Sequence, residues 1–183
     1  MKLKENLFKR KKIYKGKFIS FSKDIIILPN GKKSIREYAE HPGAVAVVPI
    51  LEKNNIILVK QYRYPVKKIT YEIPAGKLDR KEKPIDCVKR ELIEETGYET
   101  KKIKKVISYW PAPAFSTEIM HVFIATDLKF VGKNLDEDEF LESEIVPIKI
   151  AIDWIKKGKI CDSKTIIGLF FAYFKTLRSD FLP

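Results

Sequence analysis

The chain has 183 residues, of which 45% are hydrophobic, and a formal net charge of +12. This length suits one globular domain with a small appendage, and the apolar share supports a sizeable core. No apolar run approaches the roughly 20 residues that span a bilayer, and the first residues lack the apolar segment of a secretory signal. The two cysteines, Cys87 and Cys161, are far apart in the sequence. We therefore expect a reduced, cytoplasmic protein.

The positive charge is concentrated at the N-terminus. Residues 1–17 contain eight lysines and arginines against the single Glu5, which gives +7 of the total +12. Such a segment can bind nucleic acid, form a solvated face or attract an anionic nucleotide. Nucleic acid is the less favoured partner, because aromatic residues that could stack on bases are sparse in this segment.

An N-terminal sheet is predicted before residue 42. Residues 12–40 alternate as strands do, and Asn30-Gly31 is a strong hairpin turn, so we expect a hairpin over 24–40. The sequence His41-Pro42-Gly43 then breaks the pattern. The chain is accordingly divided into an N-terminal β-sheet region, residues 1–42, and a main domain, residues 43–183.

The main domain mixes strands and helices. A helix begins near Pro84, which suits a first turn, and Gly97 is placed to end it with a positive φ. Apolar runs predict strands over 44–50, 56–62, 69–73, 104–109 and 119–125, and helices over 151–157 and 164–177. Strands followed by packed helices indicate a mixed α/β sandwich.

Three carboxylates gather on the helix between Pro84 and Gly97. At helical spacing Glu91, Glu94 and Glu95 point the same way, and like charges so arranged repel unless cations compensate. Mg²⁺ prefers carboxylate oxygens and keeps waters that substrate phosphate can replace. This pattern favours a metal site for phosphate chemistry over the alternative, a solvated acidic helix face with Arg90 as a surface ion-pair partner.

The same residues belong to a longer motif. The fixed positions of the Nudix hydrolase signature are all filled, by Gly76, Glu82, Arg90, Glu91, Leu92, Glu94, Glu95 and Gly97. Tyr98 is the one departure, at a packing position where an aliphatic residue is usual. The chain therefore resembles the Nudix hydrolases. The resemblance implies an α/β/α sandwich with a mixed sheet, preceded here by a small antiparallel N-terminal sheet, and hydrolysis of a diphosphate that depends on Mg²⁺, with Mn²⁺ as an alternative.

The resemblance also assigns roles within the motif. Glu91, Glu95 and the backbone carbonyl of Ala75 are the implied metal ligands. Arg90 is expected to hold a glutamate rotamer through bidentate hydrogen bonds. Glu94 either ligates a further ion or receives that guanidinium.

An acidic stretch over residues 136–142 is the expected source of the general base. The resemblance implies that Glu137 activates the attacking water and that Glu139 is an additional metal ligand. The alternative is an ordinary charged surface loop.

Three further stretches, 71–76, 109–118 and 162–169, resemble the ADP-ribose pyrophosphatase branch of the family. Pro113 lies where that branch carries a proline, although Ala114 replaces the glycine often seen next. The branch implies conversion of ADP-ribose to AMP and ribose 5-phosphate. Alternatives are a Nudix hydrolase of GDP-mannose, FAD or NADH. A non-catalytic module that senses ADP-ribose or binds nucleic acid is the alternative of a different class.

Substrate contacts and assembly are implied by the same branch. Its members are homodimers that exchange the N-terminal sheet, and aromatic residues there sandwich adenine. Phe18 is the candidate for stacking, while Lys17 stands where an aromatic residue may occur. Arg36 and Arg63 match positions that contact the diphosphate or the terminal ribose. Either could instead be a surface ion-pair residue, and for Arg36 the two interpretations are equally favoured. The implied substrate-binding set is Phe18, Arg36, Arg63, Pro113 and Glu118.

Overall fold

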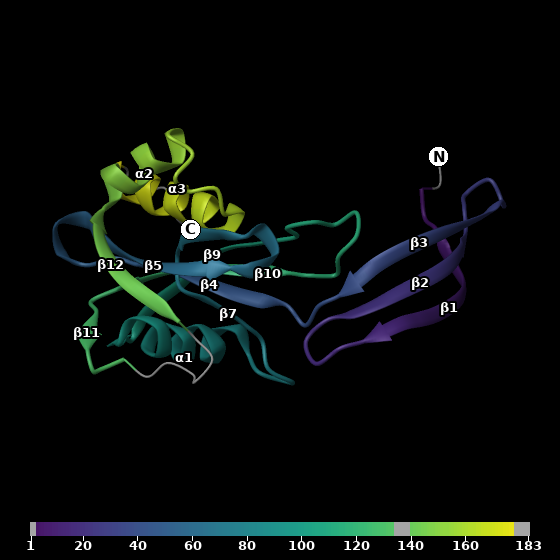
Figure 1. Cartoon of the computed structure of the whole chain (residues 1–183), viewed down its shortest axis with the longest axis horizontal. Coiled ribbons are helices and arrows are strands. Elements are labelled where there is room, and N and C mark those ends of the chain that lie inside the picture. The colour runs from purple at the N-terminus through teal and green to yellow at the C-terminus, as the bar shows by residue number, and fades with distance from the viewer. Residues whose placement is uncertain (1–2, 134–139, 178–183) are drawn as a thin grey trace. The chain divides into compact units, whose positions relative to one another are not determined.

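The structure is a computed structural model that describes residues 3–133 and 140–177. The chain divides into two compact units (Figure 1). The N-terminal unit comprises residues 1–43 and 110–119, and the main unit comprises the rest. The first boundary falls next to the predicted one, whereas segment 110–119, expected in the main domain, clusters with the N-terminal unit. None of the described helices is long and apolar enough to cross a membrane.

The N-terminal unit is built on a three-stranded antiparallel sheet. Its strands are β1 (Asn6–Lys15), β2 (Ser20–Ile27) and β3 (Lys33–Glu40), in the order β1-β2-β3. The predicted hairpin is confirmed: Gly31, with φ of 82°, lies in the turn between β2 and β3. Segment 110–119 attaches to β3, because the amide of Ala39 donates to the carbonyl of Phe115 at 2.9 Å and the carbonyl of Ala39 accepts from the amide of Thr117 at 3.0 Å.

The main unit contains two larger sheets. The first is mixed, with β4 (Ala44–Pro49) and β10 (Met120–Thr126) parallel and β7 (Ala75–Lys77) and β9 (Lys102–Tyr109) antiparallel at its edges. The second is antiparallel, in the order β12-β5-β6. Its strands are β5 (Asn55–Arg63), β6 (Lys68–Glu72) and β12 (Leu141–Pro147). A separate two-stranded sheet consists of β8 (Tyr98–Glu99) and β11 (Lys129–Phe130). Short 3₁₀ turns η1 (Glu52–Asn54) and η2 (Tyr64–Val66) flank β5.

Helices cover both faces of the mixed sheet. α1 (Pro84–Thr96) lies on one side, and α2 (Ile148–Lys156) and α3 (Ser163–Leu177) lie on the other (Figure 1). Successive residues of β4 serve the two sides in turn, as strand side chains do. Val45 and Val47 pack in the cluster that contains Leu92 of α1, whereas Ala46 and Val48 pack in the cluster that contains Leu169 of α3. The predicted α/β/α sandwich with a mixed sheet is confirmed.

Strand β12 was missed by the sequence-based prediction. Its sequence Leu-Glu-Ser-Glu-Ile-Val-Pro carries two glutamates and continues an acidic stretch, so it resembled a loop. In the structure it pairs antiparallel with β5 along its whole length, from Leu141 opposite Gln61 to Pro147 opposite Asn55. Pairing with β5 satisfies the backbone hydrogen-bonding groups of β12, and no local pattern in the sequence indicates this pairing.

The start of α3 is tied to β6 by buried polar groups. Asp162 accepts from the amide of Thr165 at 3.0 Å, so it caps the helix, and the Thr165 hydroxyl accepts from the amide of Ile73 at 2.9 Å. Lys164, on the same turn, donates to Glu72, whose side chain is 3% exposed. Burial would raise the pKa of Glu72, but the hydrogen bonds from Arg63 and the charge of Lys164 outweigh it and lower the pKa to about 2.

This network predicts an acid-sensitive contribution to stability. Because the folded pKa of Glu72 lies below its ordinary value of 4.5, the stabilisation is present above pH 4.5 and is lost as the pH falls toward 2. It amounts to about 3 kcal/mol by the usual conversion. We expect Glu72→Gln to lower the free energy of unfolding at pH 7 and to flatten its decline between pH 4.5 and 2.

Denaturant unfolding at pH 7, 4.5 and 3 measures this. Glu142→Gln is the matched control, since its side chain is 77% exposed and pairs only with Lys60 among the described residues. Equal pH slopes for Glu72→Gln and the wild type would contradict the assignment.

Candidate active site

Helix α1 turns its acidic residues toward the first strands of the main unit. It begins at Pro84 and ends at Gly97, whose φ is 78° and whose amide donates to the carbonyl of Ile93 at 2.8 Å. Both ends were predicted. The buried face contains Cys87, Val88 and Leu92, and the same face continues into two glutamates. Packing of the apolar residues therefore fixes how deep the glutamates lie.

Glu91 and Glu95 meet the backbone at the β7 turn. A Cβ atom on Gly76 would lie 1.7 Å from Oε1 of Glu91, so only glycine leaves room for that carboxylate. The amide of Ala75 donates to Oε2 of Glu95 at 2.9 Å. The two glutamates are 6% and 3% exposed. Two nearly buried carboxylates are thus held against residues 75 and 76.

Arg90 bridges the other glutamates of the motif. It donates to both oxygens of Glu82 at 3.2 Å, and its Nη1 donates to Glu91 and Glu94, each at 2.8 Å. These bonds lower the pKa of Glu82 to about 2 and raise the pKa of Arg90. The structure does not contain the alternative arrangement, in which Arg90 is a surface ion-pair partner, because its guanidinium donates hydrogen bonds to three carboxylates at once.

Cys87 takes no part in this polar cluster as a nucleophile. It is fully buried, and burial raises the pKa of its thiol. A protonated, inaccessible thiol is inert.

The oxygen donors at this place fit a hard cation. Glu82, Glu91, Glu94, Glu95 and Arg90 together carry four negative charges and one positive, a net charge of −3. Nearly buried carboxylates require compensating charge, and oxygen is the ligand atom that Mg²⁺ prefers. Residues 3–133 and 140–177 hold no ready group of three or more metal-ligating side chains. A cation here would accordingly draw on the pair Glu91 and Glu95, a backbone carbonyl and water.

The predicted site residues are distributed over both units. Those in the main unit are Ala75, Arg90, Glu91, Glu94 and Glu95, which the structure brings together, and Arg63, which binds Glu72 instead. Those in the N-terminal unit are Phe18, Arg36, Pro113 and Glu118. Arg36 donates from Nε to Glu5 at 3.0 Å. Phe18 is 54% exposed, with the ammonium of Lys17 at 4.9 Å from its ring centre. Glu137 and Glu139 lie outside the described residues.

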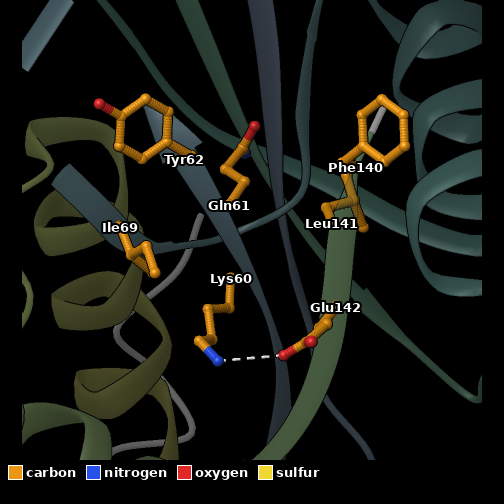
Figure 2. Close-up of a pocket in the computed structure, with 7 residues that line it drawn as sticks. All are labelled: Lys60, Gln61, Tyr62, Ile69, Phe140, Leu141 and Glu142. Carbon is orange, nitrogen blue, oxygen red and sulfur yellow. Dashed lines mark hydrogen bonds and ion pairs between the residues drawn. The ribbon is translucent and has the colours of Figure 1, made fainter. Parts of the chain in front are cut away.

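A separate cavity of about 420 Å³ lies over the outer part of the second sheet (Figure 2). Its described lining comes from β5, β6 and β12, and Glu142 is its one carboxylate, paired with Lys60 at 3.1 Å. A metal site needs several oxygen ligands. The carboxylate cluster beside β7, rather than this cavity, is therefore the candidate active site.

The chain is similar to several known proteins. Residues 40–166 match the NUDIX domain. A protein of Bacillus subtilis (strain 168) named ADP-ribose pyrophosphatase is 40% identical over 175 residues, with 94% of this chain and 95% of that protein covered. A protein of Bacillus methanolicus named methanol dehydrogenase activator is 42% identical over 167 residues, with 90% of each covered. A solved structure of an ADP compounds hydrolase matches the fold with a TM-score of 0.84 at 20% identity, over 98% of this chain and 97% of that one.

The chain belongs to the Nudix family of metal-dependent hydrolases. It is an enzyme of that family, since its relatives carry enzyme names and it keeps the carboxylates of the signature.

The approach of Glu91 to Gly76 yields a prediction. Gly76→Ala places a methyl group where the carboxylate lies, so Glu91 must rotate away from the turn. We expect metal-dependent turnover to fall by at least about 100-fold, because Glu91, a candidate metal ligand, is displaced. Thermal unfolding should change little, since the clash is relieved by a side-chain end rather than by backbone. Unchanged turnover at saturating Mg²⁺ would show that the position of Glu91 does not matter.

Proposed function

We propose that this enzyme hydrolyses the diphosphate bond of a nucleoside diphosphate sugar, and that its substrate is ADP-ribose. The observation that carries the proposal is the convergence of Glu91 and Glu95 on the backbone of residues 75 and 76, with Arg90 holding the adjoining glutamates. The relatives named ADP-ribose pyrophosphatase support the choice of substrate. Water adds to one phosphorus, the bridging P–O bond breaks, and AMP and ribose 5-phosphate leave.

The ion we propose is Mg²⁺, with Mn²⁺ as the alternative, held by Glu91, Glu95, Glu139 and the carbonyl of Ala75. When bound, such ions neutralise phosphate charge and lower the pKa of a coordinated water. The chain's own contribution is to fix these oxygens before substrate arrives. Arg90 does so for Glu91 and Glu94 through the two bonds of Nη1. This placement avoids reorganisation during the reaction.

The remaining catalytic and substrate-binding roles are also proposals. Glu137 would accept the proton of the attacking water, which is worth about 10²–10⁴ in rate for a well-placed base. Glu94 would be a further acidic group beside the ions. Arg63 would bind the diphosphate, for which a planar guanidinium is well suited. Contacts to adenine and ribose would come from Phe18, Arg36, Pro113 and Glu118.

A homodimer in which the N-terminal sheet completes the partner's site is part of the proposal. The sheet buries a polar row, with Asp24 bound by Arg10 at 3.1 Å and by the Tyr38 hydroxyl at 3.0 Å. Five of its large apolar side chains are instead about half exposed: Leu7, Phe8, Tyr14, Phe21 and Ile35. Contiguous exposed apolar surface usually marks an interface. A second copy of the chain is the occupant we propose.

We also propose a cytoplasmic location. Cys87 and Cys161 are both free thiols, in keeping with a reducing compartment.

The first experiment is incubation with ADP-ribose and Mg²⁺, with and without chelator, followed by product analysis. We expect AMP and ribose 5-phosphate only without chelator. Glu95→Gln should lower turnover at least about 100-fold while thermal unfolding stays near that of the wild type. Glu99→Gln, an exposed glutamate on β8, is the matched control and should keep full activity. A wild type that prefers GDP-mannose, FAD or NADH on a substrate panel would overturn the assignment of ADP-ribose.

Mixed dimers test the exchanged sheet. Arg36→Ala and Glu95→Gln subunits should each be poorly active alone. If the sheet of one copy serves the site of the other, a heterodimer of the two contains one intact site. An equal mixture after random exchange should then recover about a quarter of wild-type specific activity. No recovery, with heterodimers verified by native mass spectrometry, would mean that each sheet serves its own chain.

A further inference from the structure

Glu72 is a buried carboxylate just before the turn that carries Ala75 and Gly76. Arg63 approaches it with the two parallel bonds of a bidentate pair, Nε to Oε1 at 2.8 Å and Nη2 to Oε2 at 2.7 Å. The hydroxyl of Thr70 donates to Oε1 at 2.7 Å, and Lys164 donates to Oε2. With four donors on a side chain that is 3% exposed, Glu72 can act only through its neighbours.

The strand register shows that the side chain of Arg63 extends along the strand direction to reach Glu72. In the β5–β6 ladder Arg63 lies opposite Lys68. Glu72 lies opposite Val59, which precedes Arg63 by four residues on β5. At about 3.3 Å per residue this is roughly 13 Å of strand. Both side chains must therefore extend toward each other, and Thr70 lies between them on the same face. A free arginine at this position would have many other rotamers.

The direction of that extension is toward the candidate active site. Val59 lies opposite both Glu72 and Ser143, so their side chains share one face of the second sheet. Ser143 donates from this face to the carbonyl of Glu95 at 3.0 Å. Glu95 is also close enough to contribute to the raised pKa of Arg63, after the larger effect of the hydrogen bonds to Glu72. The guanidinium thus lies on the side of the metal-binding carboxylates.

We propose that Glu72 is a positioning residue, which holds the guanidinium of Arg63 so that its outer edge binds the substrate diphosphate next to Glu95. This inference rests on the proposed function in one respect, that Arg63 contacts the diphosphate. Glu72 occupies the edge formed by Nε and Nη2, while Nη1 makes no hydrogen bond to any residue in 3–133 or 140–177. The Arg63 side chain is 43% exposed, so a ligand oxygen can reach it.

Lys164 completes the electrostatics of this arrangement. Glu72 faces two cations, Arg63 and Lys164, so Arg63 is not its only counter-charge. Lys164 in turn is shared with Asp162 at 3.0 Å, which keeps it on the α3 side. The lysine therefore anchors Glu72 to the helix, and the arginine presents charge to the ligand.

Two kinds of measurement on Arg63→Ala, Glu72→Gln and the double variant test the inference. One is kcat and KM for ADP-ribose, and the other is the Kd of ADP in the absence of metal. We expect Glu72→Gln to raise KM and the ADP Kd about 10-fold, with kcat within about threefold, since substrate binding rather than chemistry is affected. In the double variant KM should equal that of Arg63→Ala, because Glu72 acts through Arg63.

If Glu72 had a merely structural role, its loss would lower the unfolding temperature without changing KM or the ADP Kd, so control variants are needed. Thr165→Val removes the buried hydrogen bond that α3 accepts from the amide of Ile73 but none of the four donors to Glu72, so it should lower the unfolding temperature while leaving KM and the ADP Kd within about twofold. Thr70→Val removes a single hydrogen bond to Glu72 and serves if Glu72→Gln does not fold. We expect it to raise the ADP Kd by about two- to threefold.

Unchanged ADP binding in both Glu72→Gln and Thr70→Val, or independent effects of Arg63 and Glu72 in the double variant, would overturn the positioning role. Wild-type kinetics in Arg63→Ala would do so as well. Failure of the proposed function can be distinguished from failure of this inference. Even if the wild type cleaves no nucleotide sugar, the Kd of ADP still measures whether Glu72 positions Arg63.

Discussion

The burial of two carboxylates against the backbone of Ala75 and Gly76 is the constraint on which the site depends. Glu91 and Glu95 lie one turn apart on the face of α1 that also packs Leu92 into the core, so the apolar contacts set their depth. Gly76 has no side chain where the carboxylate of Glu91 lies. A negative cluster in this position is costly unless cations compensate it. Arg90 supplies one such cation, and a bound metal ion would supply the rest.

Two arginines order the site by opposite routes. Arg90 is a cation that holds three acidic residues, including Glu91. At Arg63 the buried acid Glu72 holds the cation. In both cases a bidentate pair restrains a long side chain that would otherwise lose much entropy when substrate binds. Preorganisation of this kind improves binding and catalysis without adding new contacts to the substrate.

Features set by neighbouring residues could be predicted from the sequence. Pro84 and Gly97 bounded α1, Asn30-Gly31 marked the hairpin, and the spacing of Glu91 and Glu95 placed both on one face. Strand β12 could not be predicted, because its charged sequence becomes a strand only by pairing with β5, about 80 residues earlier. The same holds for Glu72, whose partner Lys164 is 92 residues away. No local pattern distinguishes a buried glutamate with distant partners from an ordinary strand residue. Segment 110–119 likewise clusters with the N-terminal unit through hydrogen bonds to Ala39 and His41 that no local pattern in the sequence indicates.

Ion pairs within the N-terminal unit neutralise part of its positive charge. Four of its basic residues are neutralised within the unit, in the pairs Arg10–Asp24, Lys12–Glu40, Lys23–Glu37 and Arg36–Glu5. In the folded unit the basic segment seen in the sequence is therefore part of a sheet crossed by ion pairs. Lys9, Lys11 and Lys15 of the exposed strand β1 carry further positive charge. A nucleotide sugar with two phosphate charges needs only a modest positive field to be attracted, whereas tight nucleic-acid binding neutralises many phosphates at once. The distribution of charge accordingly fits a small anionic substrate better than a polyanion.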